Sequence, residues 1–300
     1  MYDLVIVGGG VAGLGAAIYA KRFGMNVLVL SDFFGGTITK THLVENYPGF
    51  ASVTGLELAE SIIDHVKSTE AEMRPEKVES IEKTDAGFTV KTAKESYVAH
   101  TVLLATGTHH RKLGAPGEAE FTNKGVSYCA TCDGPFFRGK VVAVVGGSDS
   151  AVKESLLLSE FAKHVYVIYR GKEVRPEPIN KKRMDANPKI EVIAESNVVE
   201  IIGDGTLKKV KLDTGKEVDL EGLFIEIGRI PQTDLAKNLG VEMNNKGEIK
   251  IDTFSNTNVP GFYAAGDVTD TEWKQAIVGV AEGVKVSYSA YNYISAKVEA

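Results

Sequence analysis

The chain has 300 residues, of which 43% are hydrophobic and 25% charged, a composition typical of a globular protein with about two domains. The formal net charge of −6 argues against nucleic acid as a partner, and no apolar run reaches the ~18 residues that span a bilayer. With two cysteines and no basic leader at the N-terminus, the sequence predicts a cytoplasmic protein without a membrane segment.

The N-terminal segment reads as strand, glycine turn, helix and strand. Apolar runs at 4–7 and 27–30 predict two buried strands, and helical spacing begins at Leu14. Between them, Gly8, Gly10 and Gly13 form the Gly-x-Gly-x-x-Gly fingerprint of dinucleotide binding. These glycines allow a tight turn, a close approach of the backbone to a pyrophosphate, and packing of the helix on the strand. The helix N-terminus then offers free N–H groups to the phosphates.

One part of this fingerprint departs from the usual pattern. An acidic residue is expected at the end of the second strand to bind a ribose. Ser31 stands there instead, and Asp32 follows one position later. The choice between these two residues for the ribose contact stays open at this point.

The next segments complete the first half of the chain. Residues 56–65 have helical periodicity, and residues 76–98 read as strands around a turn at 85–87. A buried strand at 102–105 ends in Thr106 and Gly107, whose small size lets a cofactor lie close to the backbone. A simple strand-terminating turn is the alternative.

The only two cysteines are Cys129 and Cys132, and Asp133 follows directly. A Cys-x-x-Cys pair can close and reopen a disulfide, and an adjacent carboxyl group can supply or accept the proton that this exchange needs. Half of a zinc site and a pair of inert buried thiols are the alternatives. Zinc requires four ligands, however, and the sequence has neither a second Cys pair nor a suitable His spacing, so we expect no metal site.

The strand–turn–helix–strand pattern then restarts. A strand at 141–145 precedes a turn, a helix at 152–161 and a strand at 165–169. The turn comprises Gly146, Gly147, Ser148, Asp149 and Ser150. Two dinucleotide units in one chain suggest a permanently held flavin and a nicotinamide donor that comes and goes. Ser148 occupies the middle fingerprint position, where its Cβ crowds a phosphate and its hydroxyl can also donate a hydrogen bond.

Three cations follow this second unit: Arg170, Lys172 and Arg175. Cations at this position favour a 2′-phosphate, and hence NADPH over NADH. A solvated basic face is the alternative.

The C-terminal third contains further strands and a long helix. Residues 187–218 read as meandering strands, and another strand covers 223–228. The segment 259–267 is predicted to contain a strand that ends at Gly266 and Asp267. The last predicted helix, 274–294, begins with Lys274, Gln275 and Ala276.

Taken together, these motifs resemble the low-molecular-weight thioredoxin reductases of bacteria and archaea, over essentially the whole chain. The resemblance rests on four stretches: 8–13, the Glu-Asn-Tyr-Pro-Gly segment 45–49, the Cys-Ala-Thr-Cys-Asp-Gly segment 129–134, and 264–267 with 274–276.

The resemblance implies an α/β fold with two Rossmann-like domains, the second inserted into the first. Residues 1–111 and 240–300 would bind FAD, and residues 112–239 would bind the pyridine nucleotide, with hinges near 113–117 and 240–245. It also implies a homodimer. By similarity, the FAD contacts are Gly8, Gly10, Gly13, Ser31, Asp32, Gly36, Thr37, Asn46, Thr106, Gly107, Asp267, Lys274, Gln275 and Ala276. The family usually has Gln at position 37 and Arg at position 274.

The implied reaction passes electrons from a donor to FAD, then to the Cys129–Cys132 disulfide, and then to thioredoxin or a similar small redoxin. In this family the second cysteine faces the flavin and the first attacks the partner's disulfide, while the aspartate handles protons. These roles fall on Cys132, Cys129 and Asp133. Members that use NADPH usually carry an additional arginine where this chain has Gly171. Reduced ferredoxin or a deazaflavin is therefore an alternative donor, and a flavin-based redox sensor without turnover is an alternative function.

Overall fold

The structure is a computed structural model that describes residues 1–298. The chain divides into two units, residues 1–109 with 230–300, called unit 1 here, and residues 110–229, called unit 2. Unit 2 is thus inserted into unit 1, and the predicted α/β fold with two Rossmann-like domains is confirmed.

Unit 1 is built on one mixed sheet with the strand order β3-β2-β1-β6-β5-β4, and β17 also pairs with β6. The strands β3, β2, β1, β6 and β17 run parallel, whereas β4, β5 and β6 pair antiparallel. Its elements are β1 (Tyr2–Gly10), α1 (Val11–Arg22), β2 (Val27–Gly35), η1 (Gly36–Lys40), α2 (Gly55–Ser68), β3 (Glu72–Pro75), β4 (Val78–Thr84), β5 (Gly87–Thr92), β6 (Ser96–Leu104), η3 (Asp234–Leu239), β17 (Phe262–Ala264) and α7 (Ala276–Val298).

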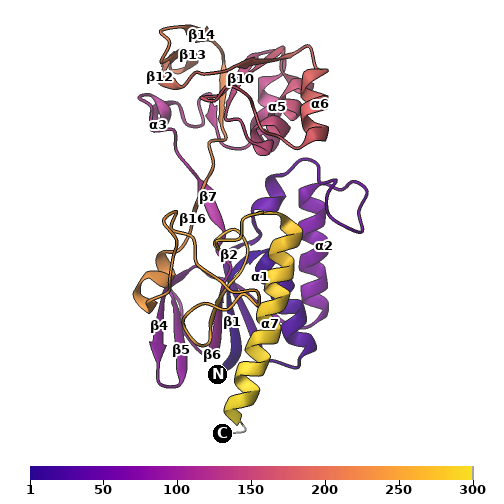
Figure 1. Ribbon diagram of the computed structural model, residues 1–300, viewed down its shortest axis with the longest axis vertical. Helices are drawn as coiled ribbons and strands as arrows, with labels where there is room; N and C mark the ends of the chain where they lie inside the picture. The colour runs from indigo at the N-terminus through magenta and orange to yellow at the C-terminus, as the bar shows by residue number, and fades with distance from the viewer. Residues whose placement is uncertain (299–300) are drawn as a thin grey trace. The chain divides into compact units, whose positions relative to one another are not determined.

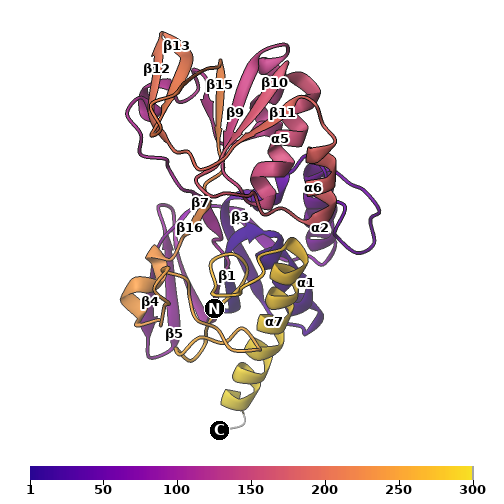
Figure 2. The same ribbon diagram turned by 45° about the horizontal axis from the view of Figure 1, so that its top comes forward.

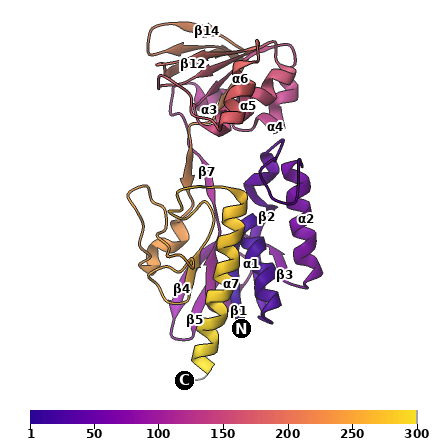
Figure 3. The same ribbon diagram turned by 45° about the vertical axis from the view of Figure 1, so that its right-hand side comes forward.

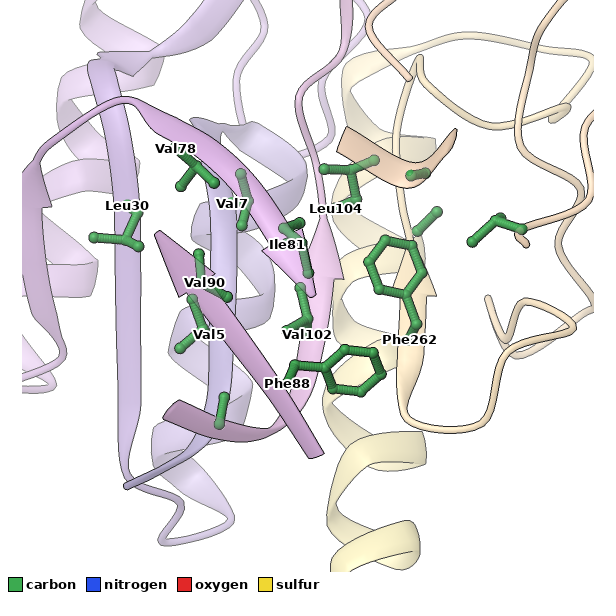
Figure 4. Close-up of a cluster of buried hydrophobic side chains, with 14 of the residues drawn as sticks. Val5, Val7, Leu30, Val78, Ile81, Phe88, Val90, Val102, Leu104 and Phe262 are labelled. Carbon is green, nitrogen blue, oxygen red and sulfur yellow. The ribbon is translucent and has the colours of Figure 1, made fainter. Parts of the chain in front are cut away.

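The parallel strands of unit 1 are buried on both faces because side chains alternate along a strand. In β1, Leu4 and Ile6 join the cluster that includes residues of α1 and α7, which Figure 1 shows side by side. Val5 and Val7 point to the other face, into the cluster of Figure 4 with Phe88. The uninterrupted apolar run therefore predicted the strand correctly.

Unit 2 contains a parallel sheet with the order β11-β10-β9-β15-β8 and a separate antiparallel sheet, β12-β13-β14. Alternation again sets its two faces: Val142 and Val144 pack with α5, and Ala143 and Val145 pack with residues of β12 and β13. Figure 2 shows β9 between α5 and the strands β12 and β13. Its elements are α3 (Glu118–Phe121), β8 (Val126–Ser127), α4 (Ala130–Asp133), η2 (Gly134–Phe137), β9 (Val141–Val145), α5 (Asp149–Phe161), β10 (His164–Ile168), α6 (Pro178–Asp185), β11 (Ile190–Ile193), β12 (Val198–Asp204), β13 (Thr206–Leu212), β14 (Glu217–Asp219) and β15 (Gly222–Ile225).

The chain passes between the units at β7 (Thr108–His110) and β16 (Arg229–Pro231), which pair with each other. The predicted boundary at residue 240 was therefore too late, because residues 230–239 belong to unit 1. The reason is η3, whose Ala236 is buried in the same core as Val78 and Ile81 of β4. Both predicted hinge segments, 113–117 and 240–245, likewise lie inside a unit.

Several short elements were not predicted from the sequence, among them α6 and α4. The helix α6 has a mostly polar sequence, so its apolar periodicity is weak. The helix α4 is a single turn that begins between the two cysteines. The long C-terminal helix begins at Ala276, two residues later than predicted; Figure 3 shows it running along unit 1.

Candidate redox site and cofactor cradle

Cys129 and Cys132 form a disulfide at the start of α4 in unit 2. Cys129 is the residue that caps this helix, and its sulfur accepts a hydrogen bond from the Cys132 N–H at 3.2 Å. Cys129 is buried, whereas Cys132 is exposed. Cys132 is therefore the more accessible of the two residues to a reductant.

Asp133 is held beside the disulfide by Ser127, a residue that sequence reasoning missed. The Ser127 hydroxyl donates to Asp133 Oδ2 at 2.6 Å and accepts the backbone N–H of Cys129 at 3.0 Å. A single hydroxyl thus connects the predicted acid–base group to the backbone of one redox cysteine. Its position at the end of β8 gave no signal, because serine is common where strands end.

A pair of buried carboxyl groups lies behind the disulfide and was also missed. Glu154 Oε1, on α5, accepts the backbone N–H of Ala130 at 3.4 Å. The pKa of Glu154 is raised to about 8, mainly by burial and secondly by the charge of Glu226. Glu226 follows β15 and lies 3.5 Å from His110 Nδ1. A signal for Glu226 was present, since it is a carboxylate inside the otherwise apolar run 223–227.

The glycine turn of unit 1 has the shape of a phosphate cradle. A side chain on Gly8 would collide with the carbonyl of Ala105, and one on Gly13 would collide with the carbonyl of Gly8. At Gly10 the space is open, and only the Cα of Gly36 would lie within 4 Å of an added Cβ. The helix α1 begins there without a side-chain cap and without an acid in its first turn. Free N–H groups and an open approach fit the pyrophosphate of FAD.

Several predicted FAD residues come together from distant parts of unit 1. Asn46 Nδ2 donates to Gln275 Oε1 at 3.1 Å, across 229 positions of sequence. Thr106 is fixed by Gln232, whose backbone carbonyl accepts its hydroxyl at 2.7 Å and whose side-chain amide donates to its carbonyl at 2.8 Å. Gln232 N–H also bonds the Gly107 carbonyl at 2.9 Å. Gln232 therefore shapes this turn, although sequence reasoning did not select it.

The loop before α7 is organised by Lys274 and Glu282. Lys274 Nζ donates to the carbonyls of Asp267 and Thr269 and forms an ion pair with Glu248 at 2.9 Å. The Gly266 N–H donates to the buried carboxylate of Glu282 at 2.6 Å. Lys274 thus stabilises the backbone around Asp267, which is half-buried.

The remaining predicted residues of unit 1 differ in their availability to a ligand. Ser31 is buried, and its hydroxyl donates to the carbonyl of Phe33 at 2.7 Å. Asp32 and Thr37 are exposed, and Ala276 is half-buried as the first residue of α7. Of the two candidates for a ribose contact, Asp32 has the carboxylate in solvent.

The glycine turn of unit 2 is more crowded. The ring of Tyr169 lies where a side chain on Gly147 or Gly171 would have to go. The N–H of Arg175 donates to the Gly147 carbonyl at 2.6 Å, so the segment after β10 folds back on this turn. A side chain at position 171 would therefore have to displace the Tyr169 ring.

Asp149 anchors this fold-back segment. It accepts the Glu177 N–H and Asn180 Nδ2, both at 2.8 Å, and pairs with Lys153 at 2.8 Å. Burial raises the pKa of Asp149, but hydrogen bonds from Lys153 and Asn180 outweigh burial and bring that pKa below its usual value. A carboxylate in the first turn of α5 opposes the binding of a phosphate there.

The three predicted cations lie on the surface of unit 2. Arg170, Lys172 and Arg175 are all exposed, as are Ser148 and Ser150 of the turn. Within residues 1–298, no ion pair engages any of the three cationic side chains. They are thus available to an anionic ligand.

The family model described as pyridine nucleotide-disulphide oxidoreductase matches residues 2–283. The chain belongs to this family. It is 39% identical to the thioredoxin reductase of Treponema pallidum, covering 98% of this chain and 97% of that protein. The crystal structure of Lactococcus lactis thioredoxin reductase in its FR conformation superposes with a TM-score of 0.95 at 35% identity, covering 98% and 99% of the two chains. A ferredoxin-flavin thioredoxin reductase from Clostridium acetobutylicum gives a TM-score of 0.54 at 33% identity, covering 98% of each chain.

The chain spans only 58% of the length of other curated relatives, such as the NADH dehydrogenase of Bacillus subtilis, to which it is 36% identical over 98% of its own length. The resemblance to low-molecular-weight thioredoxin reductases is confirmed. This family binds a flavin and NAD(P), as the two predicted dinucleotide units require. Among residues 1–298, no helix has the length and apolar character needed to cross a bilayer, and no three potential metal ligands gather.

Proposed function

We propose that this chain is an FAD-dependent thioredoxin-disulfide reductase. The observation that carries the proposal is the closed Cys129–Cys132 disulfide with Asp133 held next to it by Ser127. The end-to-end similarity to thioredoxin reductases supports the same reaction. When bound, FAD supplies the electron pair that reduces the disulfide.

The two cysteines and Asp133 each have a distinct part in this proposal. Breaking the sulfur–sulfur bond with two electrons leaves negative charge on both sulfurs, so at least one proton must be delivered nearby. Asp133 lies within one helical turn of both cysteines and exchanges that proton. Cys132, the exposed sulfur, faces the flavin. Cys129 then attacks the disulfide of thioredoxin, and its thiolate is the nucleophile.

The proposed FAD site uses the cradle of unit 1. The N-terminus of α1 with Gly10 and Gly36 would bind the pyrophosphate, and Asp32 would bind a ribose. Asn46 and Gln275, joined by a hydrogen bond, would contact the rest of the cofactor with Asp267. The proposed pyridine-nucleotide site uses the turn of unit 2 and the three exposed cations.

We favour NADPH as the donor because Arg170, Lys172 and Arg175 remain available for its 2′-phosphate. Reduced ferredoxin is the second candidate. The Tyr169 ring over Gly147 and the carboxylate of Asp149 support it, since both oppose a phosphate at the turn. The similarity to a ferredoxin-flavin thioredoxin reductase supports the same alternative.

An anaerobic titration of the purified yellow protein separates these donors. NADPH, NADH, reduced ferredoxin and a reduced deazaflavin are added in turn, and flavin bleaching is followed by absorbance. We expect bleaching by NADPH at stoichiometric amounts and less by NADH. Bleaching by ferredoxin alone would reject NADPH, and a preparation without flavin would reject the whole proposal. Multiple turnovers with thioredoxin distinguish an enzyme from a redox sensor, which stops after one equivalent.

The proposal includes a cytoplasmic homodimer with thioredoxin as a transient partner. Exposed aromatic side chains on unit 1 support a dimer: Phe23 stacks on Tyr291 with ring centroids 5.1 Å apart, and Tyr288 and Phe254 continue the patch. Isolated exposed aromatics are ordinary, whereas a contiguous patch marks an interface. Sedimentation equilibrium gives the mass directly, and a mass of one chain at micromolar concentration would reject the dimer.

A further inference from the structure

The region behind the disulfide contains a group of ionisable side chains to which the proposed function assigns no part. The Oε2 oxygen of Glu154 is buried, and Glu226 lies near enough for its charge to raise the pKa of Glu154. Glu226 is 6% exposed, so water cannot separate the two charges fully. Two carboxylates in such a place cannot both ionise easily, and the pair tends to keep one proton.

This pair is connected to the redox turn through one hydrogen bond. Glu154 Oε1 accepts the N–H of Ala130, the residue that follows Cys129 and begins α4. Cys132 lies in this single-turn helix, and Cys129 caps its start. A change in the charge of the pair therefore acts at short range on any negative charge that forms on Cys129 or Cys132.

We propose that Glu154 and Glu226 form a one-proton switch behind the disulfide, whose ionisation disfavours reduction of the Cys129–Cys132 bond. Both are positioning residues: neither touches the reacting sulfurs, and they act through the α4 turn. The inference rests on the proposed function in treating the disulfide as redox-active. Beyond that function, the inference is that pH controls how readily the disulfide is reduced.

The redox step balances as a thiol–disulfide exchange. With dithiothreitol as the reductant, its dithiol becomes a cyclic disulfide while the protein disulfide becomes a dithiol, and no other oxidant or reductant is needed. A thiolate formed on the protein disfavours the loss of the proton that the two carboxyl groups share. The reduced protein therefore holds the pair's proton up to a higher pH than the oxidised protein does.

Several charged groups face the pair from neighbouring elements. Arg229, on β16, favours the ionised pair, and His110, on β7, lies 3.5 Å from Glu226. The elements β9 and η2 contribute no titratable side chain. The other titratable residues on elements packed against α5 are Asp133, His164, Tyr166, Lys181, Lys182, Arg183, Asp185 and Glu191. All of these groups are present in both wild type and Glu154→Gln, so their effects cancel when the two proteins are compared at the same pH.

The burial of Glu154, with the neighbouring Glu226, brings its pKa to about 8. The switch therefore operates between about pH 7 and pH 9. Glu154→Gln keeps an acceptor for the Ala130 N–H but cannot ionise, so it isolates the charge from the hydrogen bond. Glu160→Gln is the matched control, because Glu160 lies on the same helix and is exposed.

The test equilibrates the purified holoprotein with fixed dithiothreitol buffers from pH 6.5 to 9.5 and counts free thiols by alkylation and mass spectrometry. At pH 6.5, wild type and Glu154→Gln should agree within about twofold in their ratio of reduced to oxidised protein. At pH 9.5 this ratio should be about tenfold higher in Glu154→Gln, the size expected for one nearby charge. Glu160→Gln should follow wild type throughout.

A second variant keeps the test decisive if Glu154→Gln does not fold. Glu226→Gln removes the neighbouring carboxyl group, so Glu154 should ionise at a lower pH. The pH at which the ratio of reduced to oxidised protein begins to fall behind that of a protein without this charge should therefore move below pH 8. A ratio between wild type and Glu154→Gln that is constant from pH 6.5 to 9.5 would overturn the proposal. An equal effect of Glu160→Gln would overturn it as well. Because dithiothreitol replaces both donor and thioredoxin, loss of thioredoxin turnover would reject the proposed function while leaving this result intact.

Discussion

The hydroxyl of Ser127 lies 2.6 Å from Oδ2 of Asp133 and donates its hydrogen to that carboxylate. The same oxygen accepts the N–H of Cys129. Ser127 therefore fixes the orientation of the proton-exchanging group relative to the cysteine that is proposed to attack thioredoxin. This bond exists within unit 2 while the disulfide is closed.

Replacing Ser127 by Ala should slow disulfide turnover about tenfold without loss of FAD. A hydrogen bond to a charged group contributes about 1.5–3 kcal/mol, and its removal leaves Asp133 free to adopt other orientations. Steady-state reduction of thioredoxin measures the effect, with flavin absorbance as the check on cofactor content. Ser61→Ala is the control, since Ser61 is exposed on α2 of unit 1. Unchanged turnover in Ser127→Ala would remove Ser127 from the site.

Cys129→Ser and Cys132→Ser should each abolish thioredoxin reduction while FAD stays bound. Neither variant can form the disulfide, and the proposed FAD cradle lies in unit 1, which contains no cysteine. The measurement is the thioredoxin assay beside the flavin spectrum of each purified variant. Appreciable thioredoxin reduction by either protein would contradict the roles given to the two sulfurs.

The local motifs were predictable from the sequence because each depends on neighbouring residues. The turns around Gly8 and Gly146 need glycine for steric reasons that act within a few positions, and Cys129 and Cys132 are adjacent on one helical turn. The partnership of Ser127 with Asp133 was local as well, but serine is too common at strand ends to be a signal.

The carboxyl pair was not predictable in this way. Glu154 and Glu226 are 72 positions apart, and only the parallel order β9-β15 brings the end of β15 beside the start of α5. The domain boundary failed for a similar reason: η3 joins unit 1 through contacts of Ala236 with β4, which no local pattern records. Sequence patterns specify short-range geometry, whereas these features depend on tertiary packing.

Gly36→Ala should weaken FAD binding strongly. Gly36 has φ of +68°, and a Cβ there would lie 2.7 Å from the Cα of Gly10, in the cradle proposed for the pyrophosphate. Gly24→Ala is a matched control, because Gly24 has φ of +74° and nothing lies within 4 Å of the added Cβ. Both changes carry the same backbone strain of about 1–2 kcal/mol. Flavin content after dialysis should fall in Gly36→Ala alone, and equal retention in both would argue against the cradle.

Arg170→Ala should reduce the preference for NADPH over NADH about tenfold, mainly through a higher KM for NADPH. An arginine bound to a phosphate contributes about 1.5–3 kcal/mol, and NADH lacks that phosphate. Lys163→Ala is the control, since Lys163 is an exposed cation at the opposite end of β10. The measurement is kcat/KM for both nucleotides. An unchanged ratio would indicate that the exposed cations form a solvated face and bind no phosphate.

Relative to wild type, Glu154→Gln should be more stable at pH 8 than it is at pH 5. Burial and the charge of Glu226 raise the pKa of Glu154 from 4.5 to about 8. Between these values the folded chain keeps a proton that the unfolded chain has lost, so the free energy of unfolding falls as pH rises through this window. Glutamine does not titrate, so the free energy of unfolding of the variant does not fall in this way as pH rises.

The difference in unfolding free energy between Glu154→Gln and wild type should therefore grow by about 2 kcal/mol from pH 5 to pH 8, below the full linkage slope because Glu226 shares the proton. Urea unfolding at the two pH values, with FAD in excess, measures it. Glu160→Gln should show the same difference from wild type at both pH values, because Glu160 is exposed. A gap that stays constant or narrows from pH 5 to pH 8 would mean that Glu154 is already ionised in the folded protein, which would place the proton elsewhere in the network with Glu226 and His110.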